Sequence, residues 1–221
     1  MKKNELIKPA VKSKTVEKRE TSYHHGDLRN LVLKVAGENL ETKGVHNLSL
    51  RDVAAEIGVS HTAPYKHFPR KLDLLHALTT LGFLELRDTL TEASSESANA
   101  FEKLRKAGEN YIKLMWKYPR RTELMFGGEV YHEGQLPEDL QVAGEEAYLA
   151  LYHIVEYGQL KNDFRKDVDT ESLSMSVWSG VHGFAVLNER NIKNAKTKIE
   201  KEKLDLQMKN LLEMLMIGIR A

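Results

Sequence analysis

Apolar residues recur along most of the chain with the spacing of an α-helix. From Asp27 onward, leucine, valine and alanine fall at i, i+3, i+4 and i+7, and Gly44 follows the last turn of this stripe. The same period continues towards the end of the sequence, with interruptions at glycine and proline, and few segments alternate with the period of two that marks a strand. The pattern predicts an all-α protein of about nine helices.

Caps and breakers set the expected limits of these helices. Glycine and asparagine tolerate the left-handed backbone at a helix end, and the residue before a proline is pushed out of the α region. Residues 92–99, which are small and polar, and residues 127–137, which contain three glycines and a proline, are expected loops. We expect helices at about residues 27–43, 49–57, 60–68, 70–92, 101–118, 119–126, 138–158, 169–188 and 203–219.

The second and third expected helices form a unit of their own. Ser49 is a good N-cap for the first of them, Gly58 ends it, and Ser60 caps the next, which Pro69 ends. Two short helices joined at a sharp glycine turn are typical of a helix-turn-helix, whose second helix enters the major groove of DNA. The alternative is a helical hairpin that binds nothing.

The second helix of this unit carries polar residues suited to DNA. His61 and Thr62 lie in its first turn, where free N–H groups favour phosphate. Tyr65 and Lys66 can bond phosphate, and Tyr65 also base edges, while His67 and Lys71 are placed to meet the backbone. Pro64 removes an N–H that would bond the Ser60 carbonyl, so we expect a distorted first turn.

Charge is divided unevenly along the chain. The net charge is +1, but residues 1–71 carry 14 Lys and Arg against 8 Asp and Glu, and residues 72–221 carry 19 against 24. A basic front suggests a polyanionic partner such as double-stranded DNA; the alternative is a flexible Lys-rich tail. We divide the chain into a flexible basic arm (1–22), a helix-turn-helix domain (23–71) and a helical ligand-binding and dimerisation domain (72–221).

Several function classes are excluded by composition. The chain has no cysteine, which removes disulfides, cysteine nucleophiles and thiolate metal sites. No segment approaches the roughly 18 consecutive apolar residues of a membrane span, and the N-terminus lacks an apolar signal segment, so we expect a cytoplasmic protein. Enzyme motifs are missing, the histidines lack metal-ligand spacing, and we expect neither a cofactor nor a metal.

Aromatic and methionine residues gather in the rear domain. Most belong to its core, and some are expected to line a cavity, because ligand sites are apolar with a few placed polar groups. Trp178 and His182 share a helix face at i, i+4, although Gly180 and Gly183 leave open a role in close helix packing alone. The predicted ligand-binding residues are Tyr111, Met115, Trp116, Phe126, Tyr152, Trp178 and His182.

The last two helices are expected to form a dimer interface. Leu204–Ile219 carries one apolar stripe, and Met214, Met216 and Ile217 lie off it. A helix that is apolar on two sides fits an isologous four-helix contact between two copies. The alternative is a helix sandwiched within one subunit.

The run from Gly44 through Leu75 resembles the DNA-binding domain of TetR-family regulators. The resemblance is carried by Ser49-Leu50-Arg51-Asp52-Val53-Ala54, Gly58-Val59-Ser60, Tyr65-Lys66-His67-Phe68, Lys71 and Leu74-Leu75. Three further segments resemble the branch whose C-terminal domain is named for a Trp-His-Gly signature. These are Tyr23-His24-His25-Gly26-Asp27-Leu28-Arg29, His61-Thr62-Ala63-Pro64-Tyr65 and Trp178-Ser179-Gly180-Val181-His182-Gly183.

The resemblance implies a homodimer that binds a palindromic operator, usually as a repressor, and that releases DNA when a small molecule fills the C-terminal domain. By position it implies DNA contacts at Ser49, His61, Thr62, Tyr65, Lys66, His67 and Lys71. Lys66 stands where arginine is often found, which keeps phosphate attraction without the bidentate fork. Residues 101–171 match only in outline, so no particular ligand is implied.

Two other functions are open at this point. One is a DNA-binding protein without a small-molecule ligand, which acts by architecture or through a protein partner. The other is an all-α enzyme or metal sensor in which the helix-turn-helix is incidental. A filled rear domain would favour the first, and turnover by residues 72–221 alone would favour the second.

Overall fold

The structure, a computed structural model, describes residues 25–95, 99–132 and 134–221. Within them the chain forms α1 (His25–Lys43), α2 (Leu50–Ile57), the 3-10 helix η1 (Pro64–Lys66), α3 (Lys71–Ser95), α4 (Ala100–Lys117), α5 (Pro119–Phe126), α6 (Glu138–Leu160), α7 (Thr170–Asn194) and α8 (Lys198–Ile219). In this part of the chain the β pairing is limited to one antiparallel bridge between Phe164 and Arg220. The predicted all-α fold is confirmed, and the predicted arm, residues 1–22, lies outside the described residues.

The front of the molecule has a core of its own. One face of α1 packs on α2, on Phe68 after η1, and on the first turns of α3. Phe68 is 2 % exposed, and burial of such a side chain stabilises the fold by about 1.5–3 kcal/mol. The other buried members of this core are Val32, Leu33, Ala36, Leu40, Leu48, Leu50, Val53, Leu74, Leu75, Leu78, Leu124 and Val130.

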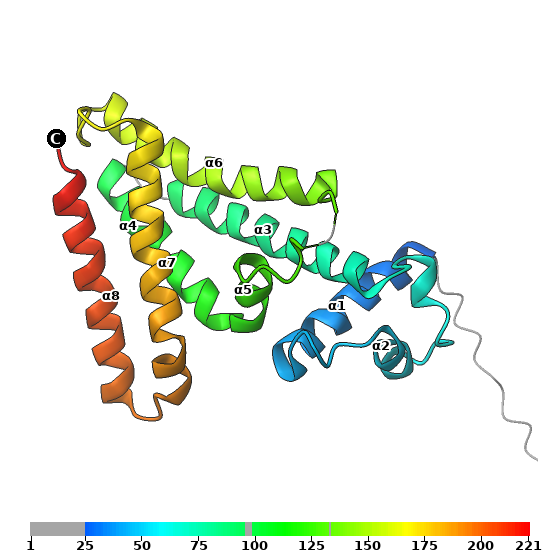
Figure 1. The fold of residues 1–221 in the computed structure, drawn as a ribbon. Helices are drawn as coiled ribbons and strands as arrows, with labels where there is room; N and C mark the ends of the chain where they lie inside the picture. Colours follow the sequence, from blue (N-terminus) through cyan, green and yellow to red (C-terminus); the bar gives the residue numbers. More distant parts are fainter. Residues whose placement is uncertain (1–24, 96–98, 133) are drawn as a thin grey trace, which may run out of the picture.

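Helix α3 belongs to both halves of the molecule. Its first turns place Leu74 and Leu78 in the front core, whereas Leu86 and Leu90 further along lie in the rear core. At about 1.5 Å per residue its 25 residues extend for roughly 37 Å. Figure 1 shows this helix running from α1 and α2 into the bundle.

The rear bundle is built around α3 and α4. Helix α6 lies alongside α3, α4 packs against α7, and α7 and α8 run antiparallel at the edge of the molecule far from α2 (Figure 1). Helices α7 and α8 are longer than the pattern predicts, because the charged segment around residues 193–203 is taken up largely as their solvated ends. Thr197 and Glu200 form a reciprocal capping box that starts α8.

None of the helices in the described ranges combines the length and the hydropathy that a bilayer crossing requires.

Candidate functional site

The turn after α2 is built from a side-chain cap and a left-handed glycine. Ser49 is extended, and its Oγ accepts hydrogen bonds from the backbone N–H groups of Arg51 and Asp52, at 3.2 and 3.4 Å. Gly58 ends the helix with φ 75°, and its N–H donates to the Ala55 carbonyl at 3.2 Å. The predicted start and end of this helix are therefore confirmed.

Residues 60–68 differ from the predicted helix. The N–H groups of Ala63 and His67 bond the carbonyls three residues earlier, those of Ser60 and Pro64, at 2.9 and 3.0 Å. Pro64 is buried and has no N–H with which to continue an α-helical ladder from Ser60. The segment is therefore two turns around the 3-10 helix η1, and Ser60 Oγ lies 3.3 Å from Thr62 Oγ1 instead of capping an α-helix.

The side chains predicted to meet DNA are largely turned to solvent. Exposed among them are His61, Thr62, Tyr65 and Lys66, with Tyr65 at 45 %. Three are half-buried: Ser49, which serves as the cap, His67, and Lys71, whose Nζ donates to the His46 carbonyl at 3.3 Å. The four exposed side chains are available to a partner. Contact of the seven residues with DNA stays a prediction.

The exposed segment rests on a braced support. Glu56 of α2 accepts hydrogen bonds from Lys43 at 2.7 Å and Asn39 at 3.0 Å, both on α1. The Lys43 ammonium beside it, followed by the Asn39 amide, lowers the pKa of Glu56. Arg29 of α1 stacks its guanidinium 5.4 Å from the centre of the Phe68 ring. These contacts hold α2 and η1 in a fixed position on α1.

A carboxylate of α1 caps a helix of the rear bundle. Glu41 Oε2 accepts from the Arg120 backbone N–H at 3.1 Å, and Oε1 accepts from the Arg121 N–H at 2.9 Å. Helix α5 begins with Pro119, and Tyr118 before it provides no side-chain cap, so Glu41 takes that role from across the junction. Burial raises the pKa of Glu41, although these N–H groups and the neighbouring arginines act in the opposite direction.

Helix α5 reaches from this cap to the interior of the bundle. Its eight residues cover roughly 10 Å, at about 1.5 Å per residue. At the start, Arg121 pairs with Glu85 of α3 at 2.6 Å, and at the end Phe126 lines a cavity. After α5, the Val130 carbonyl meets the buried His76 Nε2 of α3 at 3.0 Å. The same short helix thus contacts α1, α3 and the cavity wall.

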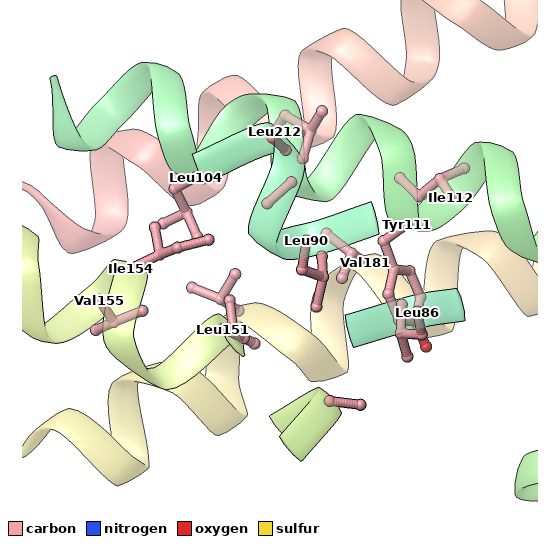
Figure 2. Close-up of a cluster of buried hydrophobic side chains, with 14 of the residues drawn as sticks. Leu86, Leu90, Leu104, Tyr111, Ile112, Leu151, Ile154, Val155, Val181 and Leu212 are labelled. Carbon is pink, nitrogen blue, oxygen red and sulfur yellow. The ribbon is translucent and has the colours of Figure 1, made fainter. Parts of the chain in front are cut away.

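The cavity lies among α3, α4, α6 and α7 and has a volume of about 240 Å³. Figure 2 shows side chains from these helices converging there, and six of the labelled ones line it: Leu86, Leu90, Leu104, Tyr111, Leu151 and Val181. Of the fifteen described residues in its wall, none is charged. Such a wall suits an apolar small molecule.

Three polar side chains form a hydrogen-bonded chain at this wall. The Trp178 indole N–H donates to the Tyr111 hydroxyl oxygen at 3.1 Å, and that oxygen lies 2.7 Å from His182 Nδ1. The arrangement in which the Trp178 and Tyr111 hydrogens are both used has Tyr111 donate to His182 Nδ1. The imidazole is then neutral and carries its proton on Nε2. Burial lowers the pKa of His182 and raises the pKa of Tyr111.

The predicted ligand-binding residues divide into three groups. Tyr111, Phe126 and Trp178 line the cavity. Met115 and His182 line, together with Phe126, a neighbouring hollow of about 380 Å³. Trp116 donates to the Ala185 carbonyl at 3.0 Å, and Tyr152 borders a separate hollow near the start of α7, so neither reaches the cavity.

The two interpretations of the Trp178 region both have structural support. Trp178 faces the cavity, as a ligand-binding role requires. A Cβ on Gly180 would lie 3.1 Å from Leu215 of α8, so this glycine allows α7 and α8 to approach closely. Gly183 meets nothing within 4 Å and has no such packing role in the described chain.

Among the residues of the site that the sequence does not predict, two matter most here, a tyrosine of the cavity wall and a carboxylate of α1. Tyr148 lines the cavity, and its hydroxyl oxygen is buried without a hydrogen-bond partner in the described chain. Its i+4 neighbour Tyr152 has the same helical register, so periodicity alone does not say which of the two faces inward. Glu41 leaves no local signal either, because its partners lie 79 and 80 residues away in the sequence.

Large apolar side chains cover the outer faces of α7 and α8. The buried stripe of α8 contains Leu204, Met208, Leu212, Met216 and Ile219. On the opposite side, exposed by 43 to 80 %, are Met175, Val186 and Leu187 of α7 and Ile199, Leu206, Met214 and Ile217 of α8. Of the off-stripe residues, Met214 and Ile217 face outward, whereas Met216 is buried.

Two protein-family models match this chain. The model described as bacterial regulatory proteins of the tetR family matches residues 32–78, which contain α2, η1 and the start of α3. The model described as the tetracyclin repressor-like C-terminal domain matches residues 104–195. Together the matched segments cover more than half of the sequence. No curated protein matches.

Solved structures share the fold over most of its length. A protein of unknown function from Rhodococcus sp. RHA1 is 28 % identical with a TM-score of 0.78, covering 91 % of this chain and 100 % of its own. The TetR-family transcriptional regulator PfmR from Thermus thermophilus is 19 % identical with a TM-score of 0.64, covering 86 % and 99 %. The transcriptional regulator FadR from Bacillus subtilis, in complex with stearoyl-CoA, is 17 % identical with a TM-score of 0.68, covering 86 % and 99 %.

Proposed function

The chain belongs to the tetR family of bacterial regulatory proteins, whose members are DNA-binding regulators and not enzymes, and we propose that it represses transcription as a homodimer released from DNA by a small molecule. The observation that carries the proposal is that one helical protein contains both an exposed polar segment and an uncharged cavity. An exposed polar segment, braced on α1, lies at one end, and an uncharged cavity lies inside the bundle behind it. A protein that acts on DNA in this way works in the cytoplasm.

The DNA contact is proposed for η1 and its flanks. Tyr65 and Lys66 are exposed there, and His61 and Thr62 precede them. A 3-10 turn offers fewer free N–H groups than an α-helix, so side chains carry most of the binding. A twofold dimer presents two such segments to successive major grooves about 34–36 Å apart, which requires an inverted-repeat operator.

Selection of bound DNA from a random pool tests this directly. An inverted-repeat consensus is the expected result, and recovery of unrelated sequences contradicts the proposal. With the selected site, Lys66→Ala is expected to weaken binding and to flatten the salt slope by about one unit for the lost phosphate contact. The matched control is Lys166→Ala, because Lys166 is also exposed but lies in the loop before α7.

The dimer contact is proposed for the outer faces of α7 and α8. Monomers rarely expose contiguous apolar patches of this kind, and an antiparallel helix pair suits a four-helix contact with a second copy. Leu187 of α7, at 80 % exposure, and Met214 of α8, at 71 %, are among its most exposed members. Leu187→Lys with Met214→Lys is expected to yield monomers in analytical ultracentrifugation, whereas Val142→Lys on α6, where Val142 is 45 % exposed, leaves the dimer intact.

A small-molecule response is supported by the cavity and by α5. The cavity disfavours the alternative of a DNA-binding protein with a filled rear domain. Phe126 at one end of α5 meets the cavity, and Glu41 of α1 caps the other end, so a ligand that shifts α5 also shifts the support of the DNA-binding segment. The expected result is a loss of operator affinity, measured by fluorescence anisotropy, when a cavity-filling compound is added.

A further inference from the structure

We propose that the cavity receives a neutral, largely apolar molecule of about eight to fifteen non-hydrogen atoms, whose single hydrogen-bonding group pairs with the Tyr148 hydroxyl. This inference rests on the proposed function, because it names the class of small molecule to which the regulator responds. It is carried by the volume of the cavity, the chemistry of its wall and one unsatisfied hydroxyl.

The volume limits the size of the ligand. A cavity of about 150 Å³ accommodates benzene, whereas pockets for drug-sized molecules begin at about 300 Å³. At about 240 Å³, this cavity lies between the two. A single ring with a short chain fits it, and a nucleotide or a coenzyme does not.

The wall limits the charge of the ligand. The described lining residues are aliphatic, aromatic or glycine, and include no Asp, Glu, Lys, Arg or His. A carboxylate, phosphate or ammonium moved into such a place loses its hydration without gaining a partner of opposite charge. Neutral molecules are therefore selected over their ionised counterparts of equal size.

The hydroxyl groups at the wall are not equivalent. Tyr111 accepts from Trp178, and its hydroxyl oxygen lies 2.7 Å from His182 Nδ1, so this hydroxyl already has two hydrogen-bond partners. Tyr148 has no such partner in the described chain, although its hydroxyl oxygen is hidden from solvent. Burial, followed by the charge of Glu171, raises the pKa of Tyr148, so its hydroxyl keeps its proton and can donate it. A buried hydroxyl without a partner is costly, and a ligand acceptor removes that cost.

Gly144 provides a way to close the cavity without disturbing the fold. It lies in the cavity wall one turn before Tyr148, and a Cβ added to it would meet nothing within 4 Å. Glycine inside a helix is also less favourable than other residues. Gly144→Phe is therefore expected to fold and to place its ring in the space that a ligand would occupy.

The test uses three probes with one apolar body: para-butylphenol, butylbenzene and para-butylbenzoate. Each is titrated into the full-length protein, without DNA, by isothermal titration calorimetry. Para-butylphenol is expected to bind about two- to tenfold tighter than butylbenzene, in line with one net hydrogen bond. Para-butylbenzoate is expected to bind at least about tenfold more weakly than the phenol, because its carboxylate has no partner.

Three variants test which residue produces the preference for the phenol. Tyr148→Phe is expected to remove the preference for the phenol while it leaves butylbenzene binding unchanged, and Gly144→Phe is expected to abolish binding of all three probes. Tyr152→Phe is the matched control, because it deletes the same group from the same helix outside the cavity. A preference that survives in Tyr148→Phe, or a benzoate that binds as tightly as the phenol, overturns the inference.

DNA binding is measured separately on the same preparations. If the protein binds an inverted-repeat operator but no probe, the inference on the ligand fails and the regulator function stands. If the probes bind in the expected order and no DNA is selected, the proposed function fails while the assignment of the cavity stands.

Discussion

Replacing Glu41 with alanine leaves the backbone N–H groups of Arg120 and Arg121, at the start of α5, without the carboxylate that accepts from them. Loss of a helix cap typically costs about 0.5–2 kcal/mol, and each net hydrogen bond contributes about 0.5–1.5 kcal/mol. Since two bonds are lost at a partly buried junction, we expect a loss of about 1–2 kcal/mol. For a chain of this size that corresponds to a melting temperature lower by about 2–8 °C.

A glutamine at the same position separates the hydrogen bonds from the charge. Burial is the largest influence on Glu41 and raises its pKa above the ordinary value of 4.5, so the folded protein favours the neutral form more than the unfolded chain does. Glu41→Gln removes the cost of burying the charge and keeps one acceptor. It is expected to lie within about 0.5 kcal/mol of the wild type at pH 7, well above Glu41→Ala.

The pH dependence of the stability tests whether the pKa of Glu41 is raised in the folded protein. The stabilisation linked to protonated Glu41 is complete below the unfolded pKa and is lost as the pH rises through the raised folded pKa. The wild type should therefore gain stability relative to Glu41→Gln as the pH falls from 7 towards 5. Chemical denaturation at both pH values measures this, with Glu38→Ala, an exposed carboxylate of the same helix, as the control. The reasoning on the cap is refuted if Glu41→Ala is as stable as Glu38→Ala, or if Glu41→Gln is the less stable of the two Glu41 variants.

Four further substitutions probe other parts of the fold. Gly158→Ala places a Cβ 2.1 Å from the Phe164 ring, and we expect a loss of at least about 2 kcal/mol in denaturant unfolding; a neutral result would contradict the packing. A Cβ added to Gly58 or to Gly144 would meet open space, but only Gly58 has a positive φ, of 75°. In thermal melts, Gly58→Ala should therefore lose about 1 kcal/mol of stability, whereas Gly144→Ala should gain about 0.5–1 kcal/mol. Burial lowers the pKa of His182 from 6.5, so the stability that neutral His182 contributes is present above pH 6.5 and is lost as the pH falls below it. The difference in stability between pH 7.5 and pH 5.5 should therefore be smaller in His182→Gln than in the wild type.

Periodicity and capping signals predict most of the helices because each leaves a local trace in the sequence. Ser49 and Gly58 mark the limits of α2 through their own side-chain and backbone chemistry, without reference to the rest of the chain. The η1 segment is where local signals disagree. Ser60 and the surrounding spacing favour an α-helix, and Pro64 opposes it by lacking the N–H that the ladder needs; the structure follows Pro64.

The sequence predicts those site residues whose position follows from the apolar pattern of their own helix. It does not predict those whose position depends on a contact with a distant helix. Tyr111, Phe126 and Trp178 fall on apolar faces that any packing of the bundle turns inward. The choice of Tyr148 over Tyr152 depends on the rotation of α6 against its neighbours, which a single helix does not encode. The Glu41 cap depends on a contact across the junction between the two halves.

The continuity of α3 has a consequence for how the protein unfolds. Because Leu74 and Leu78 complete the front core while Leu86 and Leu90 belong to the rear, neither half can lose this helix without exposing apolar surface of the other. The two halves therefore form one cooperative unit, and melting should follow a single transition. A fragment that stops at residue 71 lacks the leucines that close its core, whereas one that continues to residue 79 retains them.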